Sequence, residues 1–320
     1  MPEMLLEIID LTKSFTMRSG FFSGGNLRNI ALDRISLSVF EGETLGLVGE
    51  SGCGKSTFAL TIMRLYQPDG GRIFFAGKDI TYLGEKALKP VRKQMQMVFQ
   101  DPFASLDSRL TVEQIIGEPL EIHNIGTKVE RAAEAARLLE RVGLSAKDMQ
   151  RFPGEFSGGQ QQRISIARAL ALRPKLLICD EPVSSLDVSV QAQILNLLRD
   201  LQDEYGLSYL FISHNIAIIA FMSRRIGVMY LGRLVEIGDS TNIVNTPRHP
   251  YTQALVAAIP EPDPSKVVLD FAVGDIEGIT ERPTGCVFRH RCPIAQEICT
   301  AEEPQLRRIE ENQEAACHFV

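Results

Sequence analysis

The 320-residue sequence has no apolar run long enough to cross a membrane. Its longest runs, such as Ile216 to Met222, fall far short of the roughly 20 residues that a membrane-spanning helix needs. The opening residues 1–15 carry Glu3, Glu7, Asp10 and Lys13 among apolar side chains, which fits neither a signal peptide nor a transit peptide. We therefore expect a cytosolic protein that associates with a membrane only through partners.

An excess of basic residues is also missing. The chain has 34 Lys and Arg against 40 Asp and Glu, which gives a formal charge of −6. Binding along a nucleic acid requires concentrated positive charge to neutralise the phosphates, so we expect no nucleic-acid partner. With 44% hydrophobic residues, the chain can form the core of one large domain or two modest ones.

Up to Gly238 the sequence alternates short apolar runs with helical patterns, which predicts an α/β fold. Residues 101–156 contain helical patterns and few β-branched runs, so we predict a helical insert there. After Gly238, repeated prolines (247, 250, 260, 262 and 264) disfavour helix and predict a linker before a small appendix that contains cysteines. The predicted strands are Leu5 to Ile9, Ile35 to Val39, Thr44 to Val48, Leu176 to Cys179, Tyr209 to Ser213 and Ile226 to Tyr230; Val190, Ile194, Leu197, Leu198 and Leu201 predict one amphipathic helix.

A phosphate-binding loop is predicted at residues 49–56, where Gly-Glu-Ser-Gly-Cys-Gly-Lys-Ser fits the pattern G-x-x-x-x-G-K-[ST] between a predicted strand and a predicted helix. In such a loop the backbone N–H groups point at phosphate oxygens and the helix dipole adds to the attraction. Lys55 would reach the outer phosphates, Ser56 would bind Mg²⁺, and Thr57 an inner phosphate. The predicted nucleotide-binding residues here are Gly49, Glu50, Ser51, Gly52, Cys53, Gly54, Lys55, Ser56 and Thr57.

Two adjacent carboxylates follow the apolar run that ends at Cys179. Asp180 suits the metal, directly or through water, and Glu181 suits polarising a water molecule that attacks the γ-phosphate. Two acids at the end of a strand are alone equally typical of a solvated turn. Downstream of a phosphate loop they indicate ATP hydrolysis.

Residues 156–163, Phe-Ser-Gly-Gly-Gln-Gln-Gln-Arg, resemble the signature sequence of the ABC ATPase family, and the resemblance extends from residue 4 to about 240. The segment places a serine and two glycines at the start of a helix, where anions are favoured. The resemblance implies a P-loop NTPase fold of the ABC type, in which this segment faces the γ-phosphate held by an opposite subunit. The residues expected to act across that dimer are Ser157, Gly158, Gly159, Gln160 and Asp187.

Other positions match the family in chain order. Gln100 resembles the Q-loop glutamine that contacts Mg²⁺ and water, and His214 resembles the switch histidine. Phe15 is placed like the aromatic residue that stacks on adenine, although residues 18–27 lengthen its neighbourhood. The resemblance implies that ATP closes two subunits, that Glu181 orients water, and that His214, Gln100 and Mg²⁺ stabilise the developing charge.

Three local features resemble the oligopeptide and dipeptide importer branch of this family: residues 100–107, residues 247–255 and the cysteine appendix. The resemblance implies an ABC domain over 1–240, with its helical part at 101–156, and an importer-type region over 241–320. It also implies ATP-driven import of peptides, glutathione or nickel at the cytoplasmic face of the bacterial inner membrane. The implied partners are a second, non-identical ATPase, two permease subunits and an extracytoplasmic solute-binding protein. A soluble ABC ATPase with no transport role is the alternative, disfavoured by the single cassette and the tail.

Four cysteines, Cys286, Cys292, Cys299 and Cys317, gather near the end of the chain, which in a reducing cytosol suggests metal before disulfide. Their spacing departs from the paired C-x2-C of structural zinc sites. Four thiolates suffice for a [4Fe–4S] cluster, some relatives in the branch hold one here, and Pro293 after Cys292 is typical of ferredoxin-type ligation. A structural cluster, zinc and reduced thiols all remain open. The isolated Cys53 and Cys179 are interpreted as small apolar residues, although Cys53, beside a lysine at a helix start, could have a lowered pKa.

Overall fold

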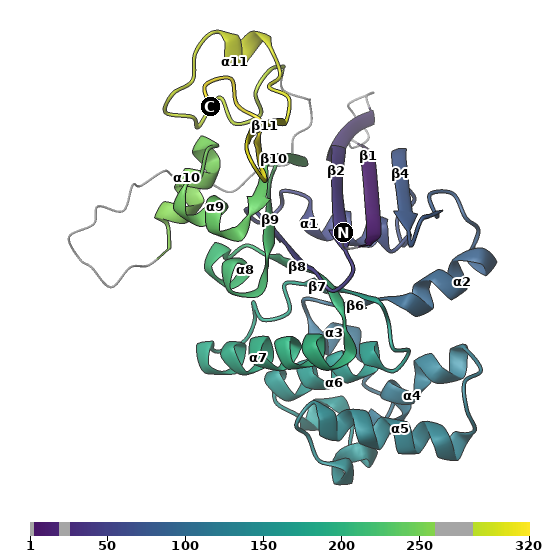
Figure 1. Ribbon diagram of the computed structural model, residues 1–320. Coiled ribbons are helices and arrows are strands. Elements are labelled where there is room, and N and C mark those ends of the chain that lie inside the picture. The colour runs from purple at the N-terminus through teal and green to yellow at the C-terminus, as the bar shows by residue number, and fades with distance from the viewer. Residues whose placement is uncertain (1–2, 19–25, 260–283) are drawn as a thin grey trace. The chain divides into compact units, whose positions relative to one another are not determined.

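The computed structural model describes residues 3–18, 26–259 and 284–320 (Figure 1). The prolines at 260, 262 and 264, and most of the stretch 18–27, lie outside the described residues. The contacts between residues divide the chain into two compact units. The helical unit comprises residues 1–3, 40–43 and 83–210, and the P-loop unit comprises residues 4–39, 44–82 and 211–320.

The helical unit has a pair of parallel strands, β6 (Met95–Val98) and β7 (Leu176–Asp180), in which Val98 lies opposite Cys179. All five residues of β7 are buried, as a strand inside an α/β sheet requires. The helices of this unit are α2 (Glu85–Gln94), α3 (Pro102–Ser105), α4 (Val112–Ile122), α5 (Lys128–Arg141), α6 (Gly158–Leu170) and α7 (Val188–Tyr205), with short 3₁₀ helices at Ala146–Gln150 and Pro153–Glu155.

Capping residues define where the helices of this unit begin. The side chains of Thr111 and Thr127 each accept a hydrogen bond from the backbone N–H three residues on. In turn, the side chains of Gln114 and Glu130 accept the backbone N–H groups of these two threonines. Helices α4, α5 and α6 then pack on one another through their apolar faces (Figure 1). Helix α7 is the predicted amphipathic helix, and it ends at Gly206 in the left-handed conformation.

The P-loop unit contains two sheets. In one, the order is β2 (Asn26–Phe40), β1 (Met4–Arg18), β4 (Gly70–Phe75) and β5 (Lys78–Asp79). In the other, β3 (Thr44–Val48) runs parallel to β9 (Arg225–Tyr230), which pairs antiparallel with β10 (Arg233–Asp239). The strand β8 (Ser208–Ser213) contains the division between the units. The six predicted strands are all confirmed. The helices are α1 (Lys55–Ile62), α8 (Ile216–Met222), α9 (Ser240–Asn245), α10 (Pro250–Ala257) and α11 (Ile298–Ala301).

The linker predicted directly after Gly238 is wrong for residues 239–257. The chain continues through α9 and α10, because Pro250 occupies the first turn of α10, where its missing N–H leaves no bond unmade. The C-terminal segment, residues 284–320, adds α11 and the strands β11 (Arg307–Glu310) and β12 (Gln313–Ala315), and β12 pairs with β10.

A buried carboxylate joins these C-terminal elements to β10. Glu236 is fully buried and accepts hydrogen bonds from the N–H groups of Arg248 and His249, both at 2.8 Å, and from Nε2 of Gln313 at 2.7 Å. A buried charge is tolerated when it is hydrogen-bonded in this way. Burial lowers the pKa of His249 to about 3, so its ring is neutral and Nδ1 accepts the N–H of Tyr251.

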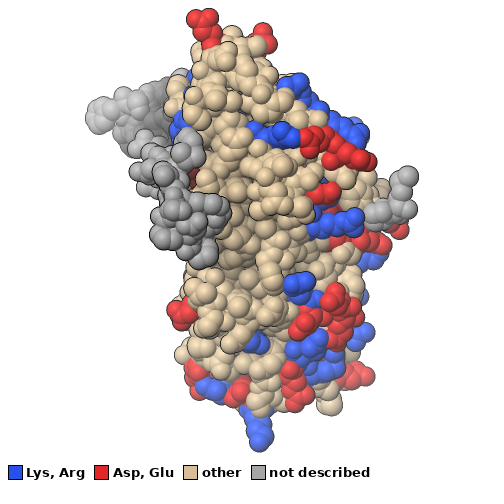
Figure 2. Space-filling model, turned by 60° about the vertical axis from the view of Figure 1, so that its left-hand side comes forward, with Lys and Arg blue, Asp and Glu red and all other residues tan. Residues whose placement is uncertain are grey.

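Charged side chains of both signs are mixed on the surface. On the face shown in Figure 2, blue and red atoms lie beside one another wherever either is abundant, and much of the face carries neither. No helix in the described parts of the chain combines the length and the apolar character needed to span a bilayer.

Candidate nucleotide site

The phosphate loop lies between β3 and α1, as its sequence predicts. Gly54 has φ of 105°, and a Cβ atom there would lie 2.3 Å from the carbonyl oxygen of Ala31, so only glycine fits. Lys55 is 4% exposed, and its ammonium donates to the carbonyl oxygens of Gly49 at 2.7 Å and Glu50 at 2.8 Å. The loop is therefore folded around its own lysine, with Ser51 and Ser56 at the surface and Thr57 half-buried.

Glu50 has contacts that sequence reasoning missed. Its N–H donates to Oη of Tyr251 at 2.8 Å, and its carboxylate forms a two-pronged ion pair with Arg291 at 2.8 and 2.9 Å. Burial raises the pKa of the Tyr251 hydroxyl, which therefore keeps its proton. Both partners lie about 200 residues or more further along the chain, and no local pattern around residue 50 points to them.

Cys53 is 1% exposed, which confirms its interpretation as a small apolar residue. The lowered pKa expected for its thiol is wrong. Burial raises the pKa of Cys53, because removing a thiolate from water outweighs the attraction of the neighbouring Lys55. Cys179 is likewise fully buried, and burial raises its pKa too.

Phe15 and His214 also lie in the P-loop unit. The Phe15 ring is half-buried, with its edge against Tyr66 at 5.3 Å between ring centroids and the ammonium of Lys13 at 5.3 Å from its own centroid. His214 is exposed and directly follows β8.

In the helical unit, the ends of two parallel strands bring two predicted residues together. Because Val98 lies opposite Cys179, the chain leaves β6 and β7 at the same edge. There Nε2 of Gln100 donates to Oε2 of Glu181 at 3.2 Å. Glu181 has φ of 46°, a left-handed backbone that is costly for a residue with a Cβ and is typical of functional sites. Asp180, the last residue of β7, is 5% exposed.

The signature segment begins α6. The Ser157 hydroxyl accepts the N–H of Gln160, and the Gln160 side chain accepts the N–H of Ser157. Gly159 lies against α7, where a Cβ would come within 2.5 Å of Val190 Cγ1. Ser157, Gly158 and Gln160 are exposed, and so is Asp187, which directly precedes α7. The predicted site residues are thus divided: residues 15, 49–57 and 214 belong to the P-loop unit, and residues 100, 157–160, 180, 181 and 187 belong to the helical unit.

The four cysteines of the C-terminal segment are free thiols, buried at 286, 299 and 317 and half-buried at 292. Burial raises the pKa of Cys286, Cys292 and Cys317, and neighbouring thiols raise each of them further. The backbone N–H groups of Phe288, Ile294 and Phe319 oppose this rise in pKa. In the described ranges, however, no three His, Cys, Asp or Glu side chains are arranged to hold a metal ion, so the structure does not support the expected iron–sulfur cluster.

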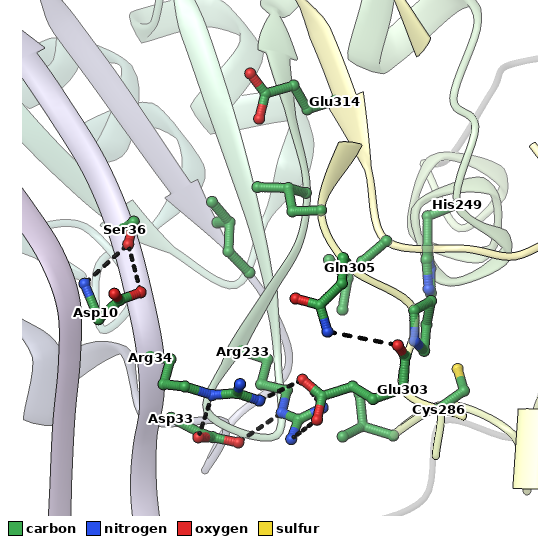
Figure 3. A pocket seen from close by; sticks show the side chains of 16 residues that line it. Asp10, Asp33, Arg34, Ser36, Arg233, His249, Cys286, Glu303, Gln305 and Glu314 are labelled. Carbon is green, nitrogen blue, oxygen red and sulfur yellow. Dashed lines mark hydrogen bonds and ion pairs between the residues drawn. The ribbon is translucent and has the colours of Figure 1, made fainter. Parts of the chain in front are cut away.

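A cavity of about 350 Å³ lies elsewhere in the P-loop unit (Figure 3). Four of its charged side chains bind one another: Arg233 pairs with Asp33 at 2.6 Å and with Glu303 at 2.9 Å, and Arg34 also pairs with Glu303. Glu303 belongs to the C-terminal segment. The cavity wall therefore fixes that segment to β2 and β10.

Comparison with known proteins decides the family. Residues 32–184 match the ABC transporter profile, and residues 235–299 match the oligopeptide/dipeptide transporter C-terminal region. The oligopeptide transport ATP-binding protein AppF of Bacillus subtilis (strain 168) is 48% identical over 326 residues, which cover 99% of this chain and 98% of AppF. The chain belongs to the ABC transporter family. Another ABC relative is the probable peptide ABC transporter ATP-binding protein y4tS of Sinorhizobium fredii. It is 47% identical, and the alignment covers 99% of this chain and 90% of y4tS.

Solved ABC structures agree with the fold. The dimeric ATP-binding cassette MJ0796, in a post-hydrolysis state bound to ADP and Pi, has a TM-score of 0.66 at 28% identity and covers 74% of this chain and 99% of its own. CbiO1 from Clostridium perfringens, part of the ABC transporter complex cbiONQ, has a TM-score of 0.65 at 27% identity and covers 80% of this chain and 93% of its own. The predicted P-loop fold of the ABC type is confirmed.

Proposed function

We propose that this chain is the ATP-hydrolysing subunit of a membrane importer of dipeptides or oligopeptides. The observation that carries the proposal is the phosphate loop around Lys55, in a chain that is 48% identical over almost its whole length to an oligopeptide transport ATP-binding protein. The match of residues 235–299 to the oligopeptide/dipeptide transporter C-terminal region supports the peptide branch. Glutathione and nickel are the other cargoes expected of this branch.

In the proposed reaction, the phosphates of ATP bind the N–H groups of residues 49–57 and the ammonium of Lys55. The Ser56 hydroxyl, the Asp180 carboxylate and the Gln100 amide would hold Mg²⁺, which when bound neutralises the phosphate oxygens. Glu181 polarises the attacking water. The hydrogen bond from Gln100 orients the Glu181 carboxylate, and His214 stabilises the charge that develops on the γ-phosphate.

A second, related ATPase subunit completes the site in this proposal. The exposed positions of Ser157, Gly158, Gln160 and Asp187 support it, because exposed groups at the start of a helix can contact a phosphate that another subunit holds. Phe15 would stack on adenine. The proposal of a non-identical partner rests on the sequence of the phosphate loop, with Cys53, and on residues 101–107, which together resemble the second ATPase of such pairs.

Two permease subunits would anchor the chain at the cytoplasmic face of the bacterial inner membrane, with an extracytoplasmic solute-binding protein supplying cargo. The exposed Phe103 on α3, within residues 100–107, supports a contact with a permease, since its side chain is 61% exposed. We assign the ATP-binding domain to residues 1–240, with its helical part at 101–156, and the importer-type region to residues 241–320.

The four C-terminal cysteines are proposed to bind a structural [4Fe–4S] cluster, with zinc or metal-free thiols as the alternatives. The four free cysteines within residues 284–320 support it, because four cysteine thiolates are the ligand set of such a cluster. Anaerobic purification with iron, sulfide and zinc assays tests the proposal: absence of iron and sulfide would rule it out.

The test of the whole proposal is purification of the tagged chain from gently solubilised membranes of its host. We expect two multi-span permeases and a second ATPase to co-purify. The complex should hydrolyse ATP, and Glu181→Gln should lower its kcat by about 100-fold or more while ATP still binds. Recovery from the soluble fraction without a permease would instead support a non-transport ABC ATPase, and an unchanged kcat would refute the role of Glu181.

A further inference from the structure

Glu50, the second residue of the phosphate loop, is held at three points. Its carbonyl oxygen accepts from the Lys55 ammonium at 2.8 Å. Its N–H donates to Tyr251 at 2.8 Å, and its carboxylate binds Arg291 at 2.8 and 2.9 Å. One residue thus connects the lysine that binds phosphate to α10 and to the C-terminal segment, all within the P-loop unit.

The ion pair between Glu50 and Arg291 is shielded and well oriented. The side chains are 10% and 26% exposed, so water screens the pair less than it would on an open surface. The guanidinium uses two nitrogens for two carboxylate oxygens, the arrangement that gives ion pairs both strength and direction. The Cζ atom of Arg291 also lies 5.8 Å from the ring centre of Tyr230 and 5.9 Å from that of Phe288.

Arg291 is presented from a well-anchored part of the chain. Phe288, three residues earlier, packs its ring against Tyr230 at 5.2 Å and Tyr251 at 5.5 Å between centroids. Further along, Glu303 binds Arg34 and Arg233 at the cavity wall (Figure 3). The guanidinium is therefore directed at Glu50 from a fixed scaffold.

Because Glu50 carries a negative charge, its ion pair with Arg291 affects how strongly the loop binds ATP. ATP brings about four negative charges to a loop that binds them mainly with N–H groups and one ammonium. A carboxylate in the same loop repels those charges unless it is neutralised. Arg291 neutralises it and also fixes the residue whose carbonyl oxygen positions Lys55.

We propose that Arg291 is a positioning residue of the phosphate loop, and that through Glu50 the C-terminal segment sets the affinity of this chain for ATP. This inference rests on the proposed ATPase function. Because coupling between two sites is reciprocal, ATP binding also tightens the C-terminal segment around Arg291.

Binding of a fluorescent ATP analogue to the full-length chain tests the inference through a set of matched variants. We expect Arg291→Gln to weaken binding about tenfold and Arg291→Lys to have an intermediate effect, because lysine keeps the charge but loses the two-pronged geometry. Arg289, two residues away and half-buried, donates to the carbonyl oxygen of Thr284, so Arg289→Gln should bind the analogue like the parent. In the purified complex, Arg291→Gln should raise KM for ATP with kcat within about twofold of the parent.

Glu50→Gln separates this role from simple packing. In the Arg291→Gln background it removes the uncompensated carboxylate and should recover most of the lost affinity, whereas loss of packing against Tyr230 and Phe288 would not be rescued. Hydrogen exchange supplies the reciprocal readout: the analogue should slow exchange at residues 284–292 in the parent and not in Arg291→Gln.

The outcomes distinguish failure of the role of Arg291 from failure of the proposed ATPase function. If the parent binds the analogue and Arg291→Gln binds it equally well, or if Glu50→Gln gives no rescue, the inference fails and the ATPase function stands. If the parent binds no nucleotide, both fail. A tenfold loss with rescue by Glu50→Gln establishes the coupling.

Discussion

Replacing Glu236 with alanine removes the acceptor for three donors at once. The N–H groups of Arg248 and His249 and the amide of Gln313 all point at its carboxylate, which is fully buried. Hydrogen bonds to charged groups contribute about 1.5–3 kcal/mol each, and donors left buried without an acceptor add a desolvation cost. Since the chain can relax and admit water, we expect a net loss of about 3–5 kcal/mol in the free energy of unfolding of the P-loop unit.

Thermal and urea unfolding of the full-length chain measures this loss. Each kcal/mol corresponds to about 2 °C in a chain of this size, so the transition of the P-loop unit should fall by about 6–10 °C. Glu311→Ala, an exposed glutamate in the same C-terminal segment, is the matched control and should change the free energy of unfolding by less than about 0.5 kcal/mol. Equal midpoints for the two variants would show that Glu236 does not join β10 to α10 and β12.

Two further predictions concern Gly54 and His249. Gly54→Ala should abolish binding of the ATP analogue and lower stability by about 2 kcal/mol or more, because its φ of 105° and the Ala31 carbonyl oxygen leave no room for a Cβ; binding like that of the parent would contradict this. The lowered pKa of His249, about 3, predicts that stability is fully present above the unfolded pKa of about 6.5 and declines as pH falls toward 3, by up to about 1.4 kcal/mol per pH unit. His249→Gln should flatten that decline in urea titrations between pH 7 and 4, whereas parallel pH profiles for the two proteins would assign the loss to other groups.

Local patterns in the sequence predicted much of the fold. Short apolar runs located the six strands, since a buried strand needs little beyond apolar side chains and a length of a few residues. The phosphate loop was also predicted from a local pattern, because its glycines and lysine all lie within residues 49–55, between β3 and α1. Gln100 and Glu181 could be predicted as a pair only through the family resemblance, since parallel strands 81 residues apart bring them together.

Features that depend on burial or on distant contacts escaped prediction. The pKa of Cys53 was expected to fall because the neighbouring Lys55 is visible in the sequence, whereas the burial that raises it comes from the whole unit. Pro250 was interpreted as a helix breaker, although at the first turn it begins α10. The pair of Glu50 with Arg291 spans 241 residues and has no local pattern at either end.

Because β12 pairs with β10, the P-loop unit can complete this sheet only after residues 313–315 have been synthesised. The ribosome makes Arg291 241 residues after Glu50 and Gln313 77 residues after Glu236, although these two residues complete the surroundings of the two carboxylates. A chain cut short before residue 284 would leave the edge of β10 open to pairing with other chains and the carboxylate of Glu50 without Arg291. Prematurely ended chains should therefore aggregate or be degraded rather than compete with intact subunits for a place in the transporter.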